Sequence, residues 1–246
     1  MELALVIDSD PVCRYVGDML DAIAQDSLAM SQVLSFSTLV SRAYADTAEA
    51  QRARSTRAGM LAEQLIAFEL GCLRLLGRLC PGLDRRIGFR DSRLEDVRRR
   101  FRQAIELRPG EPLAFDAPPD LVLVLGDWIP KAVLDACATT TPILQLGLGG
   151  QPGQGLALAG FEECRAGDDR TPVGLYRVHG ADGSREALVE GGNRTKRLFS
   201  LNQAATWDRA LSLLRSCLPA LGAGALPAGR RPAAPVEAPI PDAPRL

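Results

Sequence analysis

The sequence predicts an α/β fold with a Rossmann-like, mostly parallel sheet and helices on both faces. Two apolar runs indicate it. The run LVLVL at 121–125 does not alternate between apolar and polar residues, and PILQL at 142–146 is apolar except for Gln145. Such runs are typical of strands covered on both faces. The segment between them, 129–137, is apolar at helical spacing. A strand, helix and strand in this order form a right-handed crossover, so we expect the two strands to be parallel, central neighbours.

The amino-terminal part of the chain predicts a similar unit. Residues 3–7 are expected to form a strand, followed by a helix and by a second strand at 30–36. Nucleotide-binding sheets often begin this way, but the first strand is not followed by a G-x-G-x-x-G turn. A response-regulator receiver domain has a similar start. Its later aspartate and lysine have no counterparts here at suitable spacing, which disfavours that class.

The middle of the chain is polar and rich in arginine. Residues 39–58 are interpreted as a mobile insertion or a solvated helix, whereas one apolar stripe over 60–80 predicts a helix. Ser92 and Glu95 have the spacing of a capping box. The stretch 85–102 contains eight arginines. It can be a phosphate or nucleic-acid patch, but a solvated helix face with i,i+4 ion pairs is the favoured interpretation.

The carboxyl-terminal part adds elements to the same domain, which is expected to span 1–218. A helical segment, two strands and a long helix are predicted at 156–164, 173–178, 186–189 and 198–218. Residues 219–246 consist mostly of alanine, proline, glycine and arginine. They cannot bury enough apolar surface to offset the entropy lost on ordering, so we predict a disordered tail.

Composition excludes several classes of protein. The formal net charge of −1 gives no general case for nucleic-acid binding. Six cysteines without a C-x-x-C pair, together with a single histidine, argue against a zinc site. No basic leader is present and no apolar run approaches the roughly 20 residues that span a bilayer. A cytoplasmic protein with reduced thiols and no membrane span is therefore expected.

Three segments between 119 and about 209 carry a family resemblance. They are DLVLVLGDW at 120–128, the glycine-rich loop leading into GFEE at 160–163, and TPVGLY at 171–176. In this order they resemble the folate-dependent formyltransferases, and in particular the bacterial formyltransferase-like domains associated with sugar and glycolipid modification. The resemblance covers roughly a third of the chain.

The resemblance also implies which residues would carry the chemistry. The family uses an Asn-x-His pair and a later aspartate to polarise the formyl carbonyl and to move the proton of the attacking amine. Gln145 falls at the asparagine, Gly147 at the histidine, and Asp182 is the nearest match to the aspartate. Glycine does no acid–base chemistry. His179, the only histidine, is close in sequence to Asp182 and is considered as its replacement.

The strand ends provide the expected ligand-binding residues, because ligands of such sheets lie beyond the carboxyl ends of the strands. These residues are Gly126, Asp127, Trp128, Gly147, Gly149 and Gly150. The glycine run could also bind a small anion through its backbone amides, although it is not a P-loop.

Two functions are therefore considered. The favoured one is a non-catalytic or strongly degenerate formyltransferase-like protein, a pseudoenzyme, that binds a ligand or a protein partner. The alternative is an active formyltransferase that uses 10-formyltetrahydrofolate and an amino-sugar or nucleotide-sugar amine.

Overall fold

The computed structural model describes most of the chain between residues 1 and 222. The described residues are 1–7, 14–29, 34–42, 64, 68–69, 71–72, 75, 94–108, 110–126, 129–137, 141–149, 159–179 and 183–222. The predicted tail beyond 222 and most of the predicted helix at 60–80 lie outside these ranges. No helix within them is both long and apolar enough to cross a membrane.

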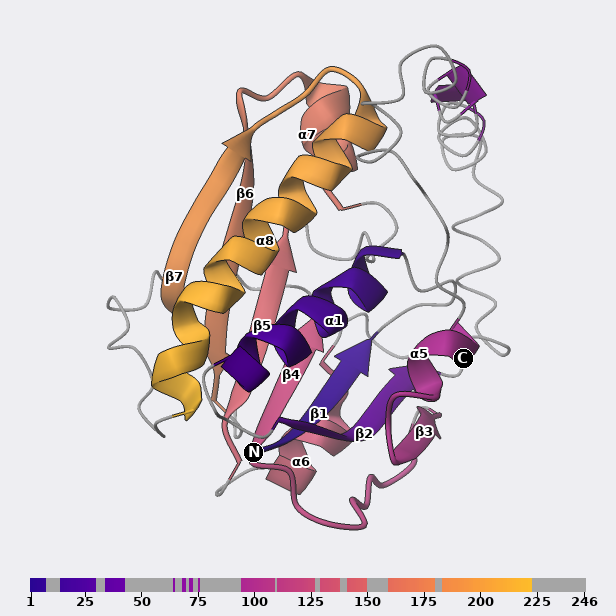
Figure 1. Cartoon of the computed structure of the whole chain (residues 1–246), viewed down its shortest axis with the longest axis vertical. Helices are drawn as coiled ribbons and strands as arrows, with labels where there is room; N and C mark the ends of the chain where they lie inside the picture. Colours follow the sequence, from indigo (N-terminus) through magenta and orange to yellow (C-terminus); the bar gives the residue numbers. More distant parts are fainter. Residues whose placement is uncertain are drawn as a thin grey trace, which may run out of the picture.

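The described elements alternate between strands and helices in the amino-terminal two thirds of the chain (Figure 1). In chain order they are β1 (Glu2–Ile7), α1 (Arg14–Ala29), β2 (Ser35–Arg42), α5 (Leu94–Arg98), β3 (Gln103–Leu107), β4 (Leu121–Leu125), α6 (Lys131–Cys137), β5 (Ile143–Leu148), α7 (Phe161–Ala166), β6 (Arg170–Val178), β7 (Arg185–Arg194) and α8 (Phe199–Gly222).

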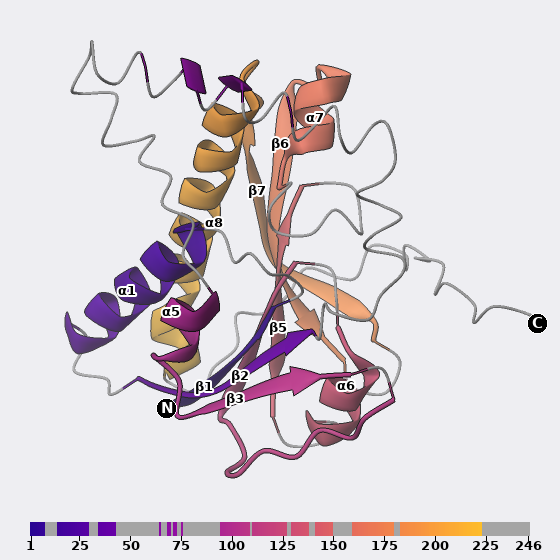
Figure 2. The same cartoon turned by 90° about the vertical axis from the view of Figure 1, so that its right-hand side faces the viewer.

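The strands of the described residues form one sheet in the order β3-β2-β1-β4-β5-β6-β7. The pairs from β3 to β5 are parallel, and β6 and β7 are antiparallel additions. Helices α1, α5 and α8 lie on one side of the sheet and α6 lies on the other (Figure 2). The predicted fold class is confirmed, and so is the prediction that β4 and β5 are parallel neighbours.

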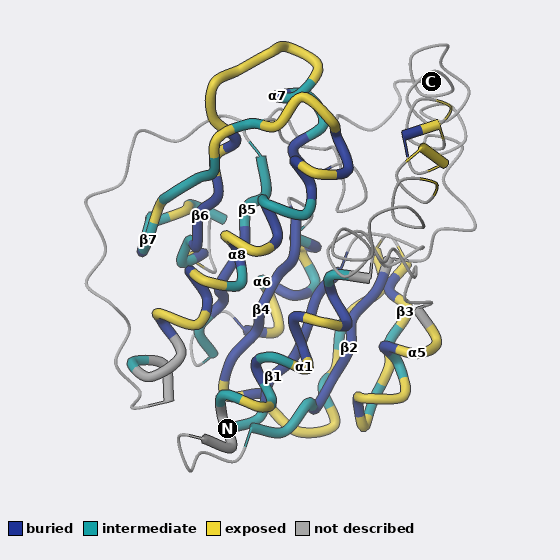
Figure 3. Tube along the Cα trace, turned by 45° about the horizontal axis from the view of Figure 1, so that its top comes forward, coloured by how far each residue is buried: buried dark blue, intermediate teal, exposed yellow. Residues whose placement is uncertain are grey.

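The apolar run in β4 is explained by two cores. Leu121, Leu123 and Leu125 belong to the cluster shared with α1 and α8, whereas Val122 and Val124 belong to the cluster shared with α6. Successive strand residues point to opposite faces, so a strand between two cores must be apolar at every position. Figure 3 shows β1 and β4 buried along their length.

The second strand lies further along the chain than predicted. β2 runs from Ser35 to Arg42, so it includes four residues assigned to the insertion at 39–58. Leu39 and Val40 are fully buried, one toward each core, and this two-sided burial decides the conformation. Residues 43–58 lie outside the described residues.

The described part of the arginine-rich stretch, residues 94–102, begins with a short helix and leads into an edge strand. α5 is a helix of five residues, and β3, which the sequence did not predict, begins right after the stretch. Arginines of the stretch pair with carboxylates on other elements rather than at i,i+4. These pairs are Arg98 with Glu106, Arg100 with Asp21, and Arg102 with Glu2.

The two-sided core gives a first testable prediction. Leu144 of β5 is fully buried, whereas Leu201 of α8 is 36% exposed. We expect Leu144→Ala to lower the free energy of unfolding by about 2–5 kcal/mol, because the truncation leaves a cavity. Leu201→Ala makes the same chemical change and should cost less than about 1 kcal/mol. Urea denaturation measures both, and equal losses would contradict this assignment of the core.

Candidate functional site

The carboxyl ends of β4 and β5 lie side by side, as the sequence predicted. The backbone N–H of Gly126 donates to the carbonyl of Leu146 at 3.2 Å, which places the end of β4 against β5. Gly147 and Gly149 follow on β5 and just beyond it. Asp127, Trp128 and Gly150, the other predicted ligand-binding residues, lie outside the described residues.

Gln145 is a fully buried amide on the face of the sheet that carries α6. Its Nε2 donates to the carbonyl oxygen of Gly126 at 2.6 Å. A carbonyl oxygen only accepts, so this contact fixes which end of the amide points to Gly126. Oε1 has no hydrogen-bond partner among the described residues. The donor end of Gln145 is thus engaged by the protein itself.

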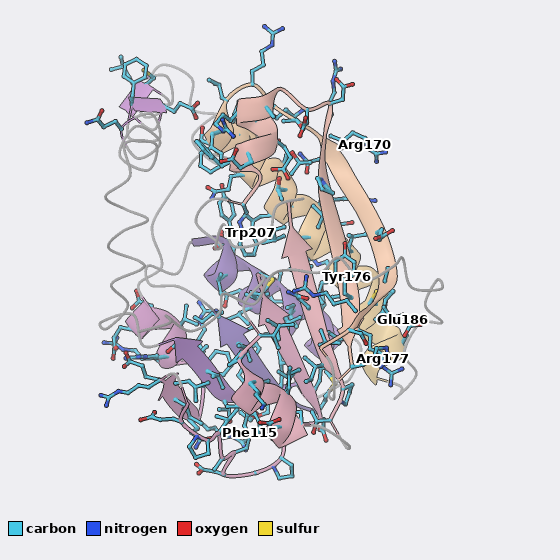
Figure 4. All side chains as sticks on the ribbon, turned by 180° about the vertical axis from the view of Figure 1, so that it is seen from behind. Phe115, Arg170, Tyr176, Arg177, Glu186 and Trp207 are labelled. Carbon is cyan, nitrogen blue, oxygen red and sulfur yellow. The ribbon has the colours of Figure 1, made fainter. Side chains whose placement is uncertain are left out.

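The ring of Tyr176 lies over two glycines next to Gln145. Tyr176 is the β6 partner of Gln145, and Gly174 is the partner of Gly147. A Cβ on Gly147 would lie 3.0 Å from Cε2 of the ring, and a Cβ on Gly174 would lie 2.4 Å from its hydroxyl oxygen. Figure 4 looks onto this face and labels Tyr176. A side chain at position 147 would therefore require the ring to shift by a few tenths of an ångström.

His179 lies at the other end of β5. The preceding residue, Val178, pairs with Ile143 at the start of β5, because β6 runs antiparallel. The backbone N–H of His179 donates to Ser184, and its Nε2 is 3.6 Å from Oε2 of Glu186. Asp182 lies outside the described residues. The structure does not bring His179 to the strand ends where Gly147 and Gly149 lie.

A buried carboxylate that the sequence analysis did not single out lies beside Gly149. A Cβ on Gly149, whose φ is 103°, would be 3.1 Å from Oε1 of Glu163 and 3.4 Å from the backbone nitrogen of Gly160. Glu163 is 4% exposed and belongs to α7. Gly149 and Gly160 thus approach each other, so the glycine-rich loop begins and ends at one place. The repeated glycines were the only sequence signal for this approach.

Asn202 of α8 holds the neighbouring elements together. Its Nδ2 donates to the carbonyl of Gly160 at 2.8 Å and to Oγ1 of Thr171 at 3.0 Å. Its Oδ1 accepts from Nδ2 of Asn193 and from the backbone N–H of Lys196. A buried amide with its donors and its acceptor satisfied is a structural anchor. This network joins α8 to the strands β6 and β7 and to the start of α7.

The described cysteines do not form a reactive centre. Burial, followed by the charge of Glu69, raises the pKa of Cys164, so its thiolate form is disfavoured. Burial raises the pKa of Cys137 to about 11. No cluster of three or more histidine, cysteine, aspartate or glutamate side chains suited to a metal occurs within the described ranges.

Close packing of Tyr176 gives a second prediction. Gly174→Ala should destabilise the protein by about 1–3 kcal/mol, because its Cβ overlaps the ring. The cost should largely disappear in a Tyr176→Ala background, and a double-mutant cycle measures this coupling. Gly71→Ala is a matched control, since a Cβ there meets no atom within 4 Å. A Gly174→Ala cost that is independent of Tyr176 would contradict the contact.

The cysteines give a third prediction. At pH 8 an alkylating reagent should modify the exposed Cys72 much faster than Cys137 in the folded protein. A thiol with a pKa of about 11 is thiolate in about one molecule in a thousand at pH 8, and burial also blocks access to it. Peptide mass spectrometry resolves the two sites, with urea-unfolded protein as the control. Similar native rates would refute the burial of Cys137.

The comparisons with known proteins find similarity in structure only. No family model matches the chain, and no curated protein matches it. Similar solved structures are formyltransferases. A sugar N-formyltransferase from Shewanella is 9% identical, with a TM-score of 0.44 over 91% of this chain and 70% of that one. A 4-N formyltransferase from Francisella tularensis is 8% identical, with a TM-score of 0.46 over 94% and 72%. Phosphoribosylglycinamide formyltransferase from Brucella melitensis is 12% identical, with a TM-score of 0.42 over 91% and 96%. These matches concern the fold and assign no role to any residue.

Proposed function

We propose that this chain is a formyltransferase-like protein that does not transfer formyl groups and that serves as a binding or partner-docking module. The observation that carries the proposal is the position of the Tyr176 ring over Gly147 and Gly174. In the family that the sequence resembles, a histidine stands where Gly147 stands here. A histidine side chain at 147 would require the ring of Tyr176 to shift.

The remaining groups do not replace the missing chemistry. Formyl transfer needs a donor for the developing oxyanion and an acid–base group for the proton of the amine. The Nε2 of Gln145 donates to the Gly126 carbonyl, so one N–H of this oxyanion donor candidate is held by the backbone. His179 pairs with Glu186 at the far end of β5. These contacts of Gln145 and His179 support the proposal that the chain does not react with 10-formyltetrahydrofolate.

Binding of a ligand requires no acid–base group, and the strand ends and the elements around them are in place to form a binding site. Gly147 and Gly149 at the carboxyl end of β5 are half-buried, and the Asn202 network fixes the elements around them. We include Asp127, Trp128 and Gly150 in the proposed binding edge from their place in the sequence. A small amino sugar, a nucleotide sugar or a protein partner is the proposed occupant.

The cysteines support a reducing, cytoplasmic setting for this function. Four cysteines within the described ranges, Cys72, Cys137, Cys164 and Cys217, are free thiols. Persistent free thiols are typical of reducing compartments. We propose the cytoplasm as the place where the protein works.

The proposal predicts that the purified full-length chain does not transfer formyl groups. The protein is incubated with 10-formyltetrahydrofolate and a panel of nucleotide-linked amino sugars, and formylated product is followed by mass spectrometry. Loss of an acid–base group alone costs about 10²–10⁴-fold in rate. From an ordinary turnover of about 1–10 per second, we therefore expect at most about 0.1 per second.

A turnover of about one per second, the low end of ordinary enzyme rates, would overturn this proposal and favour the alternative of an active formyltransferase. In that event His179→Ala and Asp182→Ala identify the acid–base group. Ser184→Ala, in the same turn, is the matched control because it removes no titratable side chain.

A further inference from the structure

Within the described residues, the connection between β3 and β4 leaves the α6 face of the sheet with little helical cover. Residues 108–120 contain four prolines, and those that the structure describes form no helix. Proline lacks the backbone N–H that a helix interior needs, which accounts for the extended course. Leu113 and Phe115 of this connection pack against the core on this face. A groove forms between the connection and α6.

The groove has the size of a small-molecule site, with a volume of about 650 Å³. One wall belongs to the β3–β4 connection and the other to α6 and the residue before it. The lining residues are Leu107, Arg108, Gly110, Glu111, Pro112, Leu113, Pro130, Lys131, Ala132, Asp135 and Ala136. Its floor is therefore apolar and its rim is charged.

Each wall of the groove carries one cation and one anion. Arg108 and Glu111 stand on the connection, and Lys131 and Asp135 stand on α6. Within the described ranges, the side chains of Arg108, Lys131 and Asp135 have no ion pair or hydrogen bond. Oε2 of Glu111 accepts only a long contact of 3.4 Å from the backbone N–H of Arg108. These charges face the groove without neutralising one another.

Such a rim is complementary to a ligand that carries both charges. A purely anionic ligand would meet Glu111 and Asp135, and a purely cationic one would meet Arg108 and Lys131. Lys131 and Asp135 are four residues apart on one helix, which places their Cα atoms about 6 Å apart along its axis. We propose that the groove binds a small zwitterion, a carboxylate and a protonated amine about 6 Å apart on an apolar chain. The carboxylate lies near Lys131 and Arg108, and the amine lies near Asp135 and Glu111.

A series of matched ligands tests the proposal on the unmodified full-length protein. The probe is 5-aminopentanoate, and its controls are pentanoate, which lacks the amine, and pentylamine, which lacks the carboxylate. Glycine keeps both charges but holds them too close together. By NMR titration we expect 5-aminopentanoate to bind with a Kd on the order of 1 mM. Each control ligand should bind at least about tenfold more weakly, because charge-assisted hydrogen bonds are lost.

Substitutions that remove one exposed charge at a time test whether the ligand binds in the groove. Lys131→Gln and Asp135→Asn should each weaken binding of 5-aminopentanoate about three- to tenfold. Lys196→Gln and Asp208→Asn remove the same charges from exposed positions outside the groove and should leave the Kd unchanged. No binding of 5-aminopentanoate, equal binding of pentanoate or pentylamine, or equal effects of the two pairs of variants would each overturn the proposal. None of these outcomes depends on the chemistry at Gly147, so this test is separate from the formyl-transfer assay.

Discussion

A sheet buried on both faces needs a helix or large side chains over every strand. On one face of this sheet the described residues provide only a short helix, α6. On the other face, α1 and α8 cover strands from β1 to β7 with one large apolar cluster. On the α6 face, a helix of seven residues and the extended connection at 108–120 together cover the apolar side chains of the sheet. The groove proposed as a binding site lies between these two elements.

At the carboxyl end of β5 the sheet is covered by the side chain of Tyr176, which belongs to the neighbouring strand β6. Tyr176 reaches along the strands instead of away from them, which requires that its neighbours Gly147 and Gly174 lack a Cβ. The two glycines and the tyrosine therefore form one unit of packing. A side chain at position 147 would require the packed ring to shift, and the ring contacts the backbone of β5 and β6 at this place.

The sequence predicted those parts of the fold that depend on two-sided burial. The runs at 121–125 and 142–146 are apolar because both cores contact them, and the pattern is visible without a structure. β3 was missed since it is an edge strand of five residues with exposed Ala104 and Glu106, and it directly follows the arginine-rich stretch at 85–102. The second strand was placed too early because Leu39 and Val40 are followed by a polar stretch, which obscured the end of the strand.

The candidate site was predictable in its residues but not in its geometry. Gln145, Gly126 and Gly147 could be placed at strand ends from the order of elements alone. His179 could not, because the direction of β6 decides its location. A parallel β6 would have ended beside Gly149, whereas the antiparallel β6 ends beside Ile143. His179 is close in sequence to Asp182, but this does not tell at which end of β5 the turn that follows His179 lies. The direction of one strand therefore separates the only histidine from the glycines at the carboxyl end of β5.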